Sequence, residues 1–316
     1  MASNYTGNTQ ALVRTELWQK QLEEITHEHL TGTPFVRQID FPDGSAMTFP
    51  SMGSSLVRDL PENSEITFDA VDTTDQQMTL NDPVVSASSF SEVLLEDSLW
   101  SSDLVSKVPV EQSQAIMERF ESDVFTLANA QSAGTGNANN INGFAHRMIG
   151  QGTNQVMTPT DFSRAHLSLV KSKVSDTGLI AIVDPTVAFE LENSTNLINV
   201  SNNPRWEGII GEGIYKNMRF VKNVMGFDVL TSNLLPDVAS ETIGADTVTN
   251  GKTNIFMSAA EERMLPFALA WKRRPIMSRD NDFNTGTEKV KTTARWGTKL
   301  IREDNLVTII TDATQV

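Results

Sequence analysis

The chain has 316 residues and a net charge of −15, from 25 Lys+Arg and 40 Asp+Glu, and it contains no cysteine. This length predicts about two domains. The lack of cysteine excludes a disulfide framework, a thiolate metal site and a cysteine nucleophile. The longest aliphatic run, Leu179–Val183, is far shorter than the ~20 residues that a membrane-spanning helix needs. We therefore expect a protein made in the cytoplasm, with a core large enough to fold without covalent links.

The charge is unevenly distributed along the chain. Residues 1–160 hold 7 basic and 21 acidic residues, whereas residues 161–316 hold 18 and 19. Within the second part, Arg263–Arg302 holds ten basic and three acidic residues, a net charge of +7. An acidic front and a basic rear segment can attract each other within a subunit or between copies. The alternative is a solvated acidic surface beside a locally basic sheet. Sequence-specific DNA binding is disfavoured, because the basic segment lacks interleaved aromatic residues.

The N-terminal residues predict a short amphipathic helix that ends at Thr31-Gly32-Thr33-Pro34. Its apolar residues recur at near-helical spacing: Leu12, Trp18, Leu22 and Ile25. A terminal helix of this kind needs another surface on which to dock.

The next residues, 36–85, predict extended structure with few large apolar residues and many acids. The expected strands, with a turn at residues 42–45, are Val36–Phe41, Ala46–Pro50, Glu65–Val71 and Gln77–Leu80. In the third strand, Ile66 and Phe68 lie on one side. Because a two-stranded hairpin is marginally stable by itself, this hairpin must lie on another surface. That surface belongs to a second copy or, as the alternative, to the same chain.

Two helices are predicted next, at Ser88–Val105 and at Val110–Gln131, with Pro109 at the start of the second. The apolar stripe of the second helix is regular: Ile116, Phe120, Val124 and Leu127. A helix of this length spans about 30 Å at 1.5 Å per residue.

Residues 131–160 are rich in Gly and Asn and predict a loop-rich boundary. Thr158-Pro159-Thr160-Asp161 then predicts a helix start, with a Thr cap, an early Pro and an acid in the first turn. A tight turn is expected at Asn250-Gly251. The expected strands of this second part are Leu179–Val183, Tyr215–Val221, Phe227–Thr231, Thr253–Met257, Phe267–Trp271, Lys289–Trp296 and Leu306–Thr311. These elements predict an α+β fold with more than one sheet.

Motifs for catalysis are incomplete. Asn250-Gly251-Lys252-Thr253 resembles the end of a phosphate loop but lacks the upstream Gly at the required position. Asp176-Thr177-Gly178 matches the aspartic-protease triplet but has no second copy. His27 and His29 are two residues apart, whereas the zinc-protease pattern needs four. We therefore predict no enzyme, no catalytic or metal site and no cofactor.

The order of the predicted elements, together with several short sequence segments, resembles the major capsid proteins of tailed double-stranded DNA bacteriophages, which have the Hong Kong 97 type capsid fold. The segments are Phe49–Gly53 with Arg58–Glu62, Ala181–Pro185, Gly226–Pro236, and the closing stretch from Met264–Ala268 to Thr311. The resemblance covers nearly the whole chain.

This resemblance implies a division into five parts. Residues 1–35 would form an N-terminal arm, residues 36–85 an extended loop lying across a neighbouring subunit, and residues 86–140 a peripheral domain with a long spine helix. Residues 141–262 would form the axial domain, and residues 263–316 the C-terminal strands that return to both sheets.

The resemblance also implies partners. Copies of the chain would assemble as hexamers and pentamers of an icosahedral head in the bacterial cytoplasm, with a scaffolding protein, a portal and in some phages a decoration protein. The head would enclose DNA without sequence-specific binding and without a membrane. The expected contacts of the extended loop are Phe49, Met52, Arg58, Asp59, Glu62, Ile66 and Phe68, and those of the arm are Leu12, Trp18, Leu22 and Ile25. We expect Arg58 to pair with an acid of a neighbouring subunit.

Three alternatives stay open. The shell of a cellular nanocompartment has the same fold but would need cargo with a docking peptide. A soluble hydrolase would need a convergent catalytic cluster. A tail or host-recognition protein would be rich in β repeats, and the sequence has no internal repeat.

One prediction concerns covalent cross-linking. Some shells of this type are linked by a Lys–Asn isopeptide bond whose Lys lies on the extended loop, but this chain has no Lys between Lys20 and Lys107. We therefore expect no isopeptide cross-link from residues 36–85 in assembled shells. Peptide mass spectrometry of digested shells tests this, and a cross-linked peptide from that region would contradict it.

Overall fold

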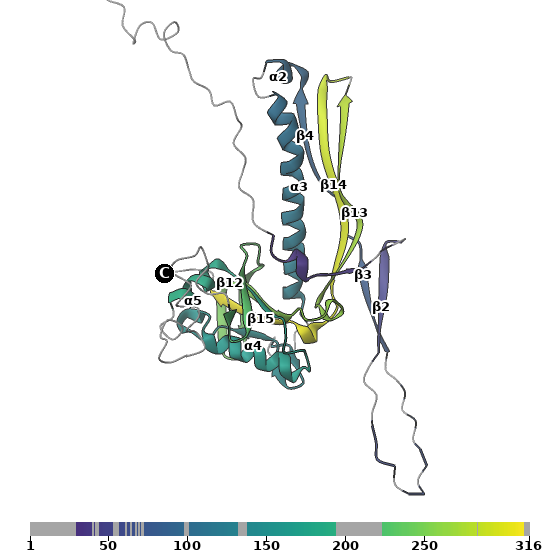
Figure 1. The fold of residues 1–316 in the computed structure, drawn as a ribbon. Helices are drawn as coiled ribbons and strands as arrows, with labels where there is room; N and C mark the ends of the chain where they lie inside the picture. Colours follow the sequence, from purple (N-terminus) through teal and green to yellow (C-terminus); the bar gives the residue numbers. More distant parts are fainter. Residues whose placement is uncertain are drawn as a thin grey trace, which may run out of the picture.

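The computed structural model describes residues 30–39, 41, 44–52, 57–60, 62–63, 65–66, 68, 70, 73–97, 101–131, 138–193, 223–282 and 284–312. Within this part, a tall unit made of one long helix and a long hairpin stands above a rounded unit, and a second hairpin extends in the opposite direction (Figure 1). The predicted strand at Tyr215–Val221 and the predicted N-terminal helix lie outside the described residues. No helix of the described part is both long enough and apolar enough to span a membrane.

The tall unit is built on a four-stranded sheet of order β1-β13-β14-β4. Its strands are β1 (Arg37–Ile39), β13 (Phe267–Asp282), β14 (Thr287–Leu300) and β4 (Val84–Ser91). Helix α3 (Ser101–Thr126) packs along one face, mainly on β14 and β4. The predicted stripe faces the sheet, since Ile116, Phe120 and Val124 are buried. The Phe120 ring lies 4.9 Å from the Trp271 ring and 5.7 Å from the Trp296 ring, centroid to centroid.

The predicted helix boundaries in this region are partly wrong. Residues 84–91 form strand β4 rather than the start of a helix, and only α2 (Glu92–Asp97) lies between β4 and α3. The burial of β4 alternates residue by residue because α3 covers one face of the sheet, and β4 pairs with β14 along its whole length. Pairing with a strand that is distant in the sequence thus overrides the local helical spacing. Helix α3 begins at Ser101, so that Pro109 lies inside it, and ends at Thr126; a 3₁₀ turn, η2 (Leu127–Ala130), follows.

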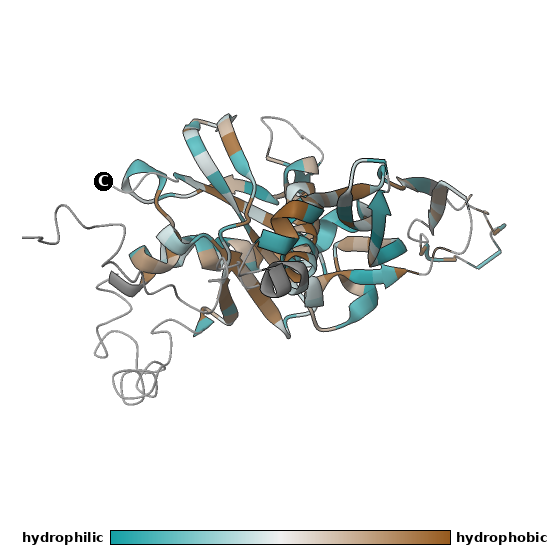
Figure 2. Ribbon diagram, turned by 90° about the horizontal axis from the view of Figure 1, so that it is seen from above, coloured by the Kyte–Doolittle hydropathy of each residue, from teal (hydrophilic) through white to brown (hydrophobic). Residues whose placement is uncertain are grey.

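The rounded unit contains a seven-stranded sheet of order β7-β15-β12-β8-β10-β9, with β11 paired to β12. Its strands are β7 (Arg147–Ile149), β8 (Leu179–Val183), β9 (Asn223–Val224), β10 (Phe227–Thr231), β11 (Asp237–Ile243), β12 (Asp246–Ser258) and β15 (Val307–Asp312). Helices α4 (Pro159–Lys171) and α5 (Pro185–Asn193) lie beside this sheet. Phe162 of α4 packs edge-on against Phe256 and Phe227 of the sheet. Hydrophobic residues gather where α3 meets the sheets (Figure 2).

The predicted start of α4 is confirmed. Thr158 and Asp161 form a capping box, in which the Asp161 carboxylate accepts hydrogen bonds from the backbone N–H of Thr158 at 2.9 Å and from its hydroxyl at 2.8 Å. Arg164 pairs with the other carboxylate oxygen of Asp161 at 3.0 Å.

The predicted turn at Asn250-Gly251 is wrong, because both residues lie inside β12. The turn that joins β11 to β12 lies between Ile243 and Asp246, where Gly244 has a φ of +64°. Asn250 has a φ of 59°, and the pairing of β12 with β11 keeps the same register on both sides of it. A Cβ on Gly251 would lie 2.5 Å from Val248 Cγ1, so the strand needs glycine there for close packing.

The extended hairpin consists of β2 (Ala46–Met52) and β3 (Thr73–Thr79). The segment that precedes it does not join this hairpin as expected: Arg37–Ile39 instead pairs in parallel with Ala268–Ala270 of β13. The base of the hairpin packs on its own chain, since Phe41, Met78 and Ala270 form a cluster with Met47, Phe49 and Leu80. The tip projects away from both units (Figure 1). The base of the hairpin therefore packs on its own chain, as the alternative predicted, whereas the described tip residues are exposed.

Candidate interaction surfaces

The tall and rounded units are joined by a buried arginine. Arg147, 6% exposed, lies on β7 and binds the Glu241 carboxylate of β11 through two hydrogen bonds of 2.6 and 2.7 Å. The same guanidinium donates to the carbonyl of Ala128, to Thr308 Oγ1 and to Asn129 Oδ1, each at 3.3 Å. One side chain thus connects the turn after α3 with three strands of the seven-stranded sheet.

Neutral side chains complete this junction. Gln131 Nε2 donates to the carbonyl of Leu306 at 2.8 Å, and Gln131 Oε1 accepts from the Thr308 hydroxyl at 2.7 Å. The Thr253 hydroxyl donates to Asn129 Oδ1 at 2.7 Å. Because buried polar groups have strong geometric preferences, this network fixes the end of α3 against β12 and β15.

We predict that Arg147→Met lowers the free energy of unfolding by about 3–5 kcal/mol, because it leaves the Glu241 carboxylate without its partner in a largely buried site. The double variant Arg147→Met/Glu241→Met should recover part of this loss, since it removes the uncompensated charge. Chemical denaturation of unassembled subunits measures both. Equal stability of the wild type and the single variant would contradict the prediction.

The root of the N-terminal segment is bound to α3 by a buried carboxylate. Glu121 is fully buried and accepts hydrogen bonds from the backbone N–H of Thr31 at 2.9 Å and from the hydroxyls of Thr31 and Thr33 at 3.3 and 3.5 Å. Gly32 lies so close to Phe125 that a Cβ would be 2.5 Å from its ring. These contacts hold residues 31–33 against α3. The predicted arm residues Leu12, Trp18, Leu22 and Ile25 lie outside the described residues.

The predicted contact residues of the loop occupy two different environments. Arg58, Asp59, Glu62, Ile66 and Phe68 are exposed. Phe49 is half-buried in the cluster at the hairpin base, where it packs on its own chain. The side chain of Met52 lies outside the described part. Val57 and Leu60 are also exposed, by 95% and 62%, and sequence reasoning did not select them. The sequence signal for them was that both are apolar residues in a stretch of polar and charged residues.

A buried histidine lies at a second junction, between β7, α4 and the turn at Glu303–Asn305. His146 Nδ1 is 3.0 Å from the carbonyl of Phe144, and Nε2 is 2.8 Å from the Ser172 hydroxyl, so both ring nitrogens have partners. Burial lowers the pKa of His146, although the Phe144 carbonyl and the carboxylates of Asp304 and Glu303 oppose this shift. The unfolded chain therefore binds a proton here at a higher pH than the folded chain does.

We predict that the subunit loses stability as the pH falls below about 6.5, the ordinary histidine pKa, towards the lower pKa of folded His146. His146→Asn keeps a donor near the Phe144 carbonyl and should show a smaller loss between pH 7 and 5.5. Thermal unfolding at each pH measures this. His166→Asn, at a half-exposed histidine that pairs with Asp176, is the control. Parallel pH profiles of wild type and His146→Asn would contradict the prediction.

The sequence motifs for catalysis do not converge. Asp176 lies at the surface and pairs with His166, and Lys252 lies within β12 and pairs with Asp237 at 2.8 Å. In the described residues, no group of three or more His, Asp or Glu side chains could hold a metal ion. His27 and His29 lie outside this part.

Comparison with known proteins identifies the family. The family described as "Phage capsid protein" matches residues 89–309, which is more than half of the chain. The chain belongs to the phage capsid protein family. A comparison with curated protein sequences gives no match.

Several solved phage structures share the fold. The capsid structure of the cyanophage P-SCSP1u has a TM-score of 0.73 at 15% identity, covering 96% of this chain and 94% of the other. The mature capsid of bacteriophage PhiM1 has a TM-score of 0.71 at 11% identity, covering 96% and 93%. A structure from Mycobacterium phage Che8 has a TM-score of 0.66 at 14% identity, covering 94% and 97%.

These comparisons confirm the capsid-type α+β fold and the class of function predicted from the sequence. The protein is a structural capsid protein of a phage virion, as its family is, rather than an enzyme.

Proposed function

We propose that this capsid protein assembles as hexamers and pentamers of an icosahedral head, and that the loop of each copy lies on the neighbouring copy. The observation that carries the proposal is the exposure of large apolar side chains at the loop tip. Val57 and Phe68 are 95% and 90% exposed, and Leu60 and Ile66 are 62% exposed. Exposed apolar groups on a projecting segment are typical of a surface that is covered in an assembly.

The five parts of the chain take corresponding roles in this proposal. Residues 1–35 act as an arm whose root is bound to Glu121, and residues 36–85 act as the intersubunit loop. Residues 86–140 and 263–316 form the peripheral unit around α3. Residues 141–262 form the axial unit, whose loops meet at the centre of each capsomer.

Further partners are part of the same proposal. A scaffolding protein, a portal and a decoration protein would contact the shell during assembly in the host bacterial cytoplasm, and the shell would enclose DNA without reading its sequence. The family match supports a viral head over a cellular nanocompartment, a soluble hydrolase or a tail protein.

Electron microscopy of the purified chain, with light scattering for size, tests the proposal. We expect closed icosahedral shells, or hexamer and pentamer rings. A monomer that stays unassembled at high concentration and with its scaffolding protein added would contradict the proposal.

A charge reversal tests the role of the loop. Arg58→Glu should leave the subunit folded, because residue 58 is exposed on the loop, but should reduce the yield of shells several-fold by opposing an acid of the neighbour. Circular dichroism checks the fold, and particle counts measure assembly. Arg263→Glu is the control, since Arg263 is exposed outside the loop and pairs with Glu261 of its own chain. Wild-type shell yields from Arg58→Glu would contradict the assignment of Arg58.

A further inference from the structure

The chain contains two Asn-Gly pairs, and the fold places them in opposite environments. The first pair, Asn142-Gly143, is the two-residue turn between β5 (Asn140–Ile141) and β6 (Phe144–Ala145). Asn142 and Gly143 have φ values of 51° and 83°, a combination that is typical of a type I′ turn. Both residues are exposed, and a Cβ on Gly143 would meet no atom within 4 Å. The peptide bond that joins them is therefore accessible to water.

The second pair, Asn250-Gly251, lies inside β12. Gly251 is buried and lies opposite Val238 of β11 on one side and Asp312 of β15 on the other. A Cβ at Gly251 would be 2.5 Å from Val248 Cγ1 and 2.7 Å from Ile310 Cγ2, so its backbone is closely surrounded. The backbone at this pair can change its conformation only if β12 separates from both neighbouring strands.

An Asn-Gly peptide unit can react with its own side chain. Once a base has taken the proton of the glycine amide, the nitrogen attacks the asparagine Cγ, because no glycine Cβ shields it. A bond forms between this nitrogen and Cγ, the bond between Cγ and Nδ2 breaks, and Nδ2 leaves as ammonia after taking a proton from water. Water then opens the resulting succinimide at one of its two carbonyl groups. The product is aspartate, or isoaspartate if the chain now continues through Cγ.

We propose that Asn142 is a site of spontaneous deamidation in the folded subunit, whereas Asn250 is protected by the fold. Ring closure requires the backbone at the asparagine to leave the left-handed conformation. At the exposed tip of a two-residue hairpin this opening is local, but at Gly251 it requires β12 to detach from β11 and β15. Local opening of a surface turn costs much less free energy than opening of a core strand. The proposal needs only the fold of the subunit and does not depend on assembly.

Asn142 also joins the hairpin to the end of α4. Its Nδ2 donates a hydrogen bond to the carbonyl of Lys171, the last residue of α4, at 3.4 Å. Nearby, the Ser168 hydroxyl donates to the carbonyl of Ala145 at 2.8 Å. The Lys171 ammonium lies 5.3 Å from the centre of the Phe144 ring. A change at Asn142 therefore acts on the contact between the hairpin and the helix.

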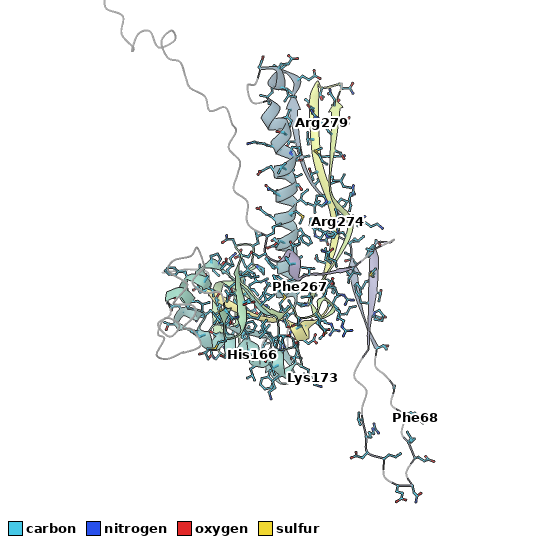
Figure 3. The ribbon with its side chains drawn as sticks, in the orientation of Figure 1. Phe68, His166, Lys173, Phe267, Arg274 and Arg279 are labelled. Carbon is cyan, nitrogen blue, oxygen red and sulfur yellow. The ribbon has the colours of Figure 1, made fainter. Side chains whose placement is uncertain are left out.

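Deamidation weakens this contact. A carboxylate at position 142 has no donor for the Lys171 carbonyl, and the carboxyl end of a helix repels its charge. Lys171 is exposed, so the attraction of its ammonium for the new charge is weak. In isoaspartate the backbone gains a carbon atom, which disturbs the pairing of Asn140 with Ala145. The hairpin should then separate from α4 at the edge of the rounded unit, where Lys173 follows the helix (Figure 3).

Mass spectrometry tests the proposal on the full-length chain. The chain is incubated in mildly alkaline buffer, both folded and in denaturant, and is then digested at acidic pH, where further deamidation is slow. Peptide masses report the exchange of amide for acid at residues 142 and 250, and an isoaspartate-specific methyltransferase detects the isoaspartyl product. In the folded chain we expect the reaction at 142 to be about tenfold faster than at 250, or more, and in denaturant we expect similar rates.

Three results would overturn the proposal. The first is a folded chain in which residue 142 reacts no faster than residue 250. The second is a product at residue 142 that contains no isoaspartate, because a succinimide gives both products. The third is a difference between the two sites that persists in denaturant, since the local sequence rather than the fold would then cause it.

Hydrogen exchange tests the effect on the hairpin. The matched variant is Asn142→Gly, because Gly-Gly also forms a type I′ turn but has no side-chain amide to react. The backbone amides of residues 140–145 should exchange faster in aged wild-type chain than in fresh chain, whereas ageing should leave Asn142→Gly unchanged. Faster exchange after ageing in both proteins, or in neither, would overturn the link between deamidation and the hairpin.

Discussion

The arrangement of the two units depends on the buried guanidinium of Arg147. Its five hydrogen-bond acceptors belong to Glu241, Ala128, Asn129 and Thr308, which come from the turn after α3 and from two strands of the seven-stranded sheet. Taking a charge out of water is costly, and only a complete set of partners offsets that cost. The network therefore favours one orientation of α3 relative to the sheet over others. A shell built from many copies needs a defined orientation of α3 relative to the sheet in every subunit. A small error in this orientation would otherwise add up around the shell.

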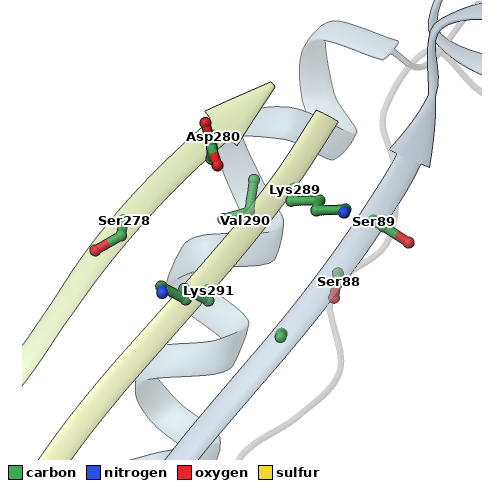
Figure 4. Close-up of a pocket in the computed structure, with 8 residues that line it drawn as sticks. Ser88, Ser89, Ser278, Asp280, Lys289, Val290 and Lys291 are labelled. Atoms are coloured by element: carbon green, nitrogen blue, oxygen red, sulfur yellow. The ribbon is translucent and has the colours of Figure 1, made fainter. Parts of the chain in front are cut away.

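The two faces of the four-stranded sheet carry different kinds of side chain. One face of the sheet is covered by α3, where Phe120 packs against Trp271 and Trp296. The opposite face lacks a cover within the described part of the subunit and contains a hollow of about 300 Å³ (Figure 4). The lining of this hollow includes Lys289, Lys291, Asp280 and small side chains of β4 and β13. The face under α3 therefore holds the subunit together, whereas the opposite face presents charged and small side chains to solvent.

The stability of such an assembly must come from many weak contacts. The loop offers no lysine for a covalent link, and a single surface ion pair contributes only about 0–1 kcal/mol. Apolar side chains such as Phe68 contribute more when they are buried, about 1.5–3 kcal/mol each. In the proposed shell, such a contribution would be repeated at every interface between copies.

The sequence by itself determined the elements whose signals are local. The capping box at Thr158 and Asp161, the stripe of Ile116, Phe120 and Val124, and the buried strand Leu179–Val183 follow from spacing and side-chain chemistry, and the order of the elements predicted the capsid family. Tertiary structure decided what depends on distant partners. Residues 84–91 became a strand because β14 provides hydrogen bonds along their whole length, and Arg37–Ile39 joined β13 rather than its neighbour in sequence. Asn250-Gly251 became part of a long strand because β11 and β15 pair with β12 on either side of it. The partners of Arg147 and the hollow beneath Lys289 and Lys291 could not be predicted, because each is built from residues that only the folded chain brings together.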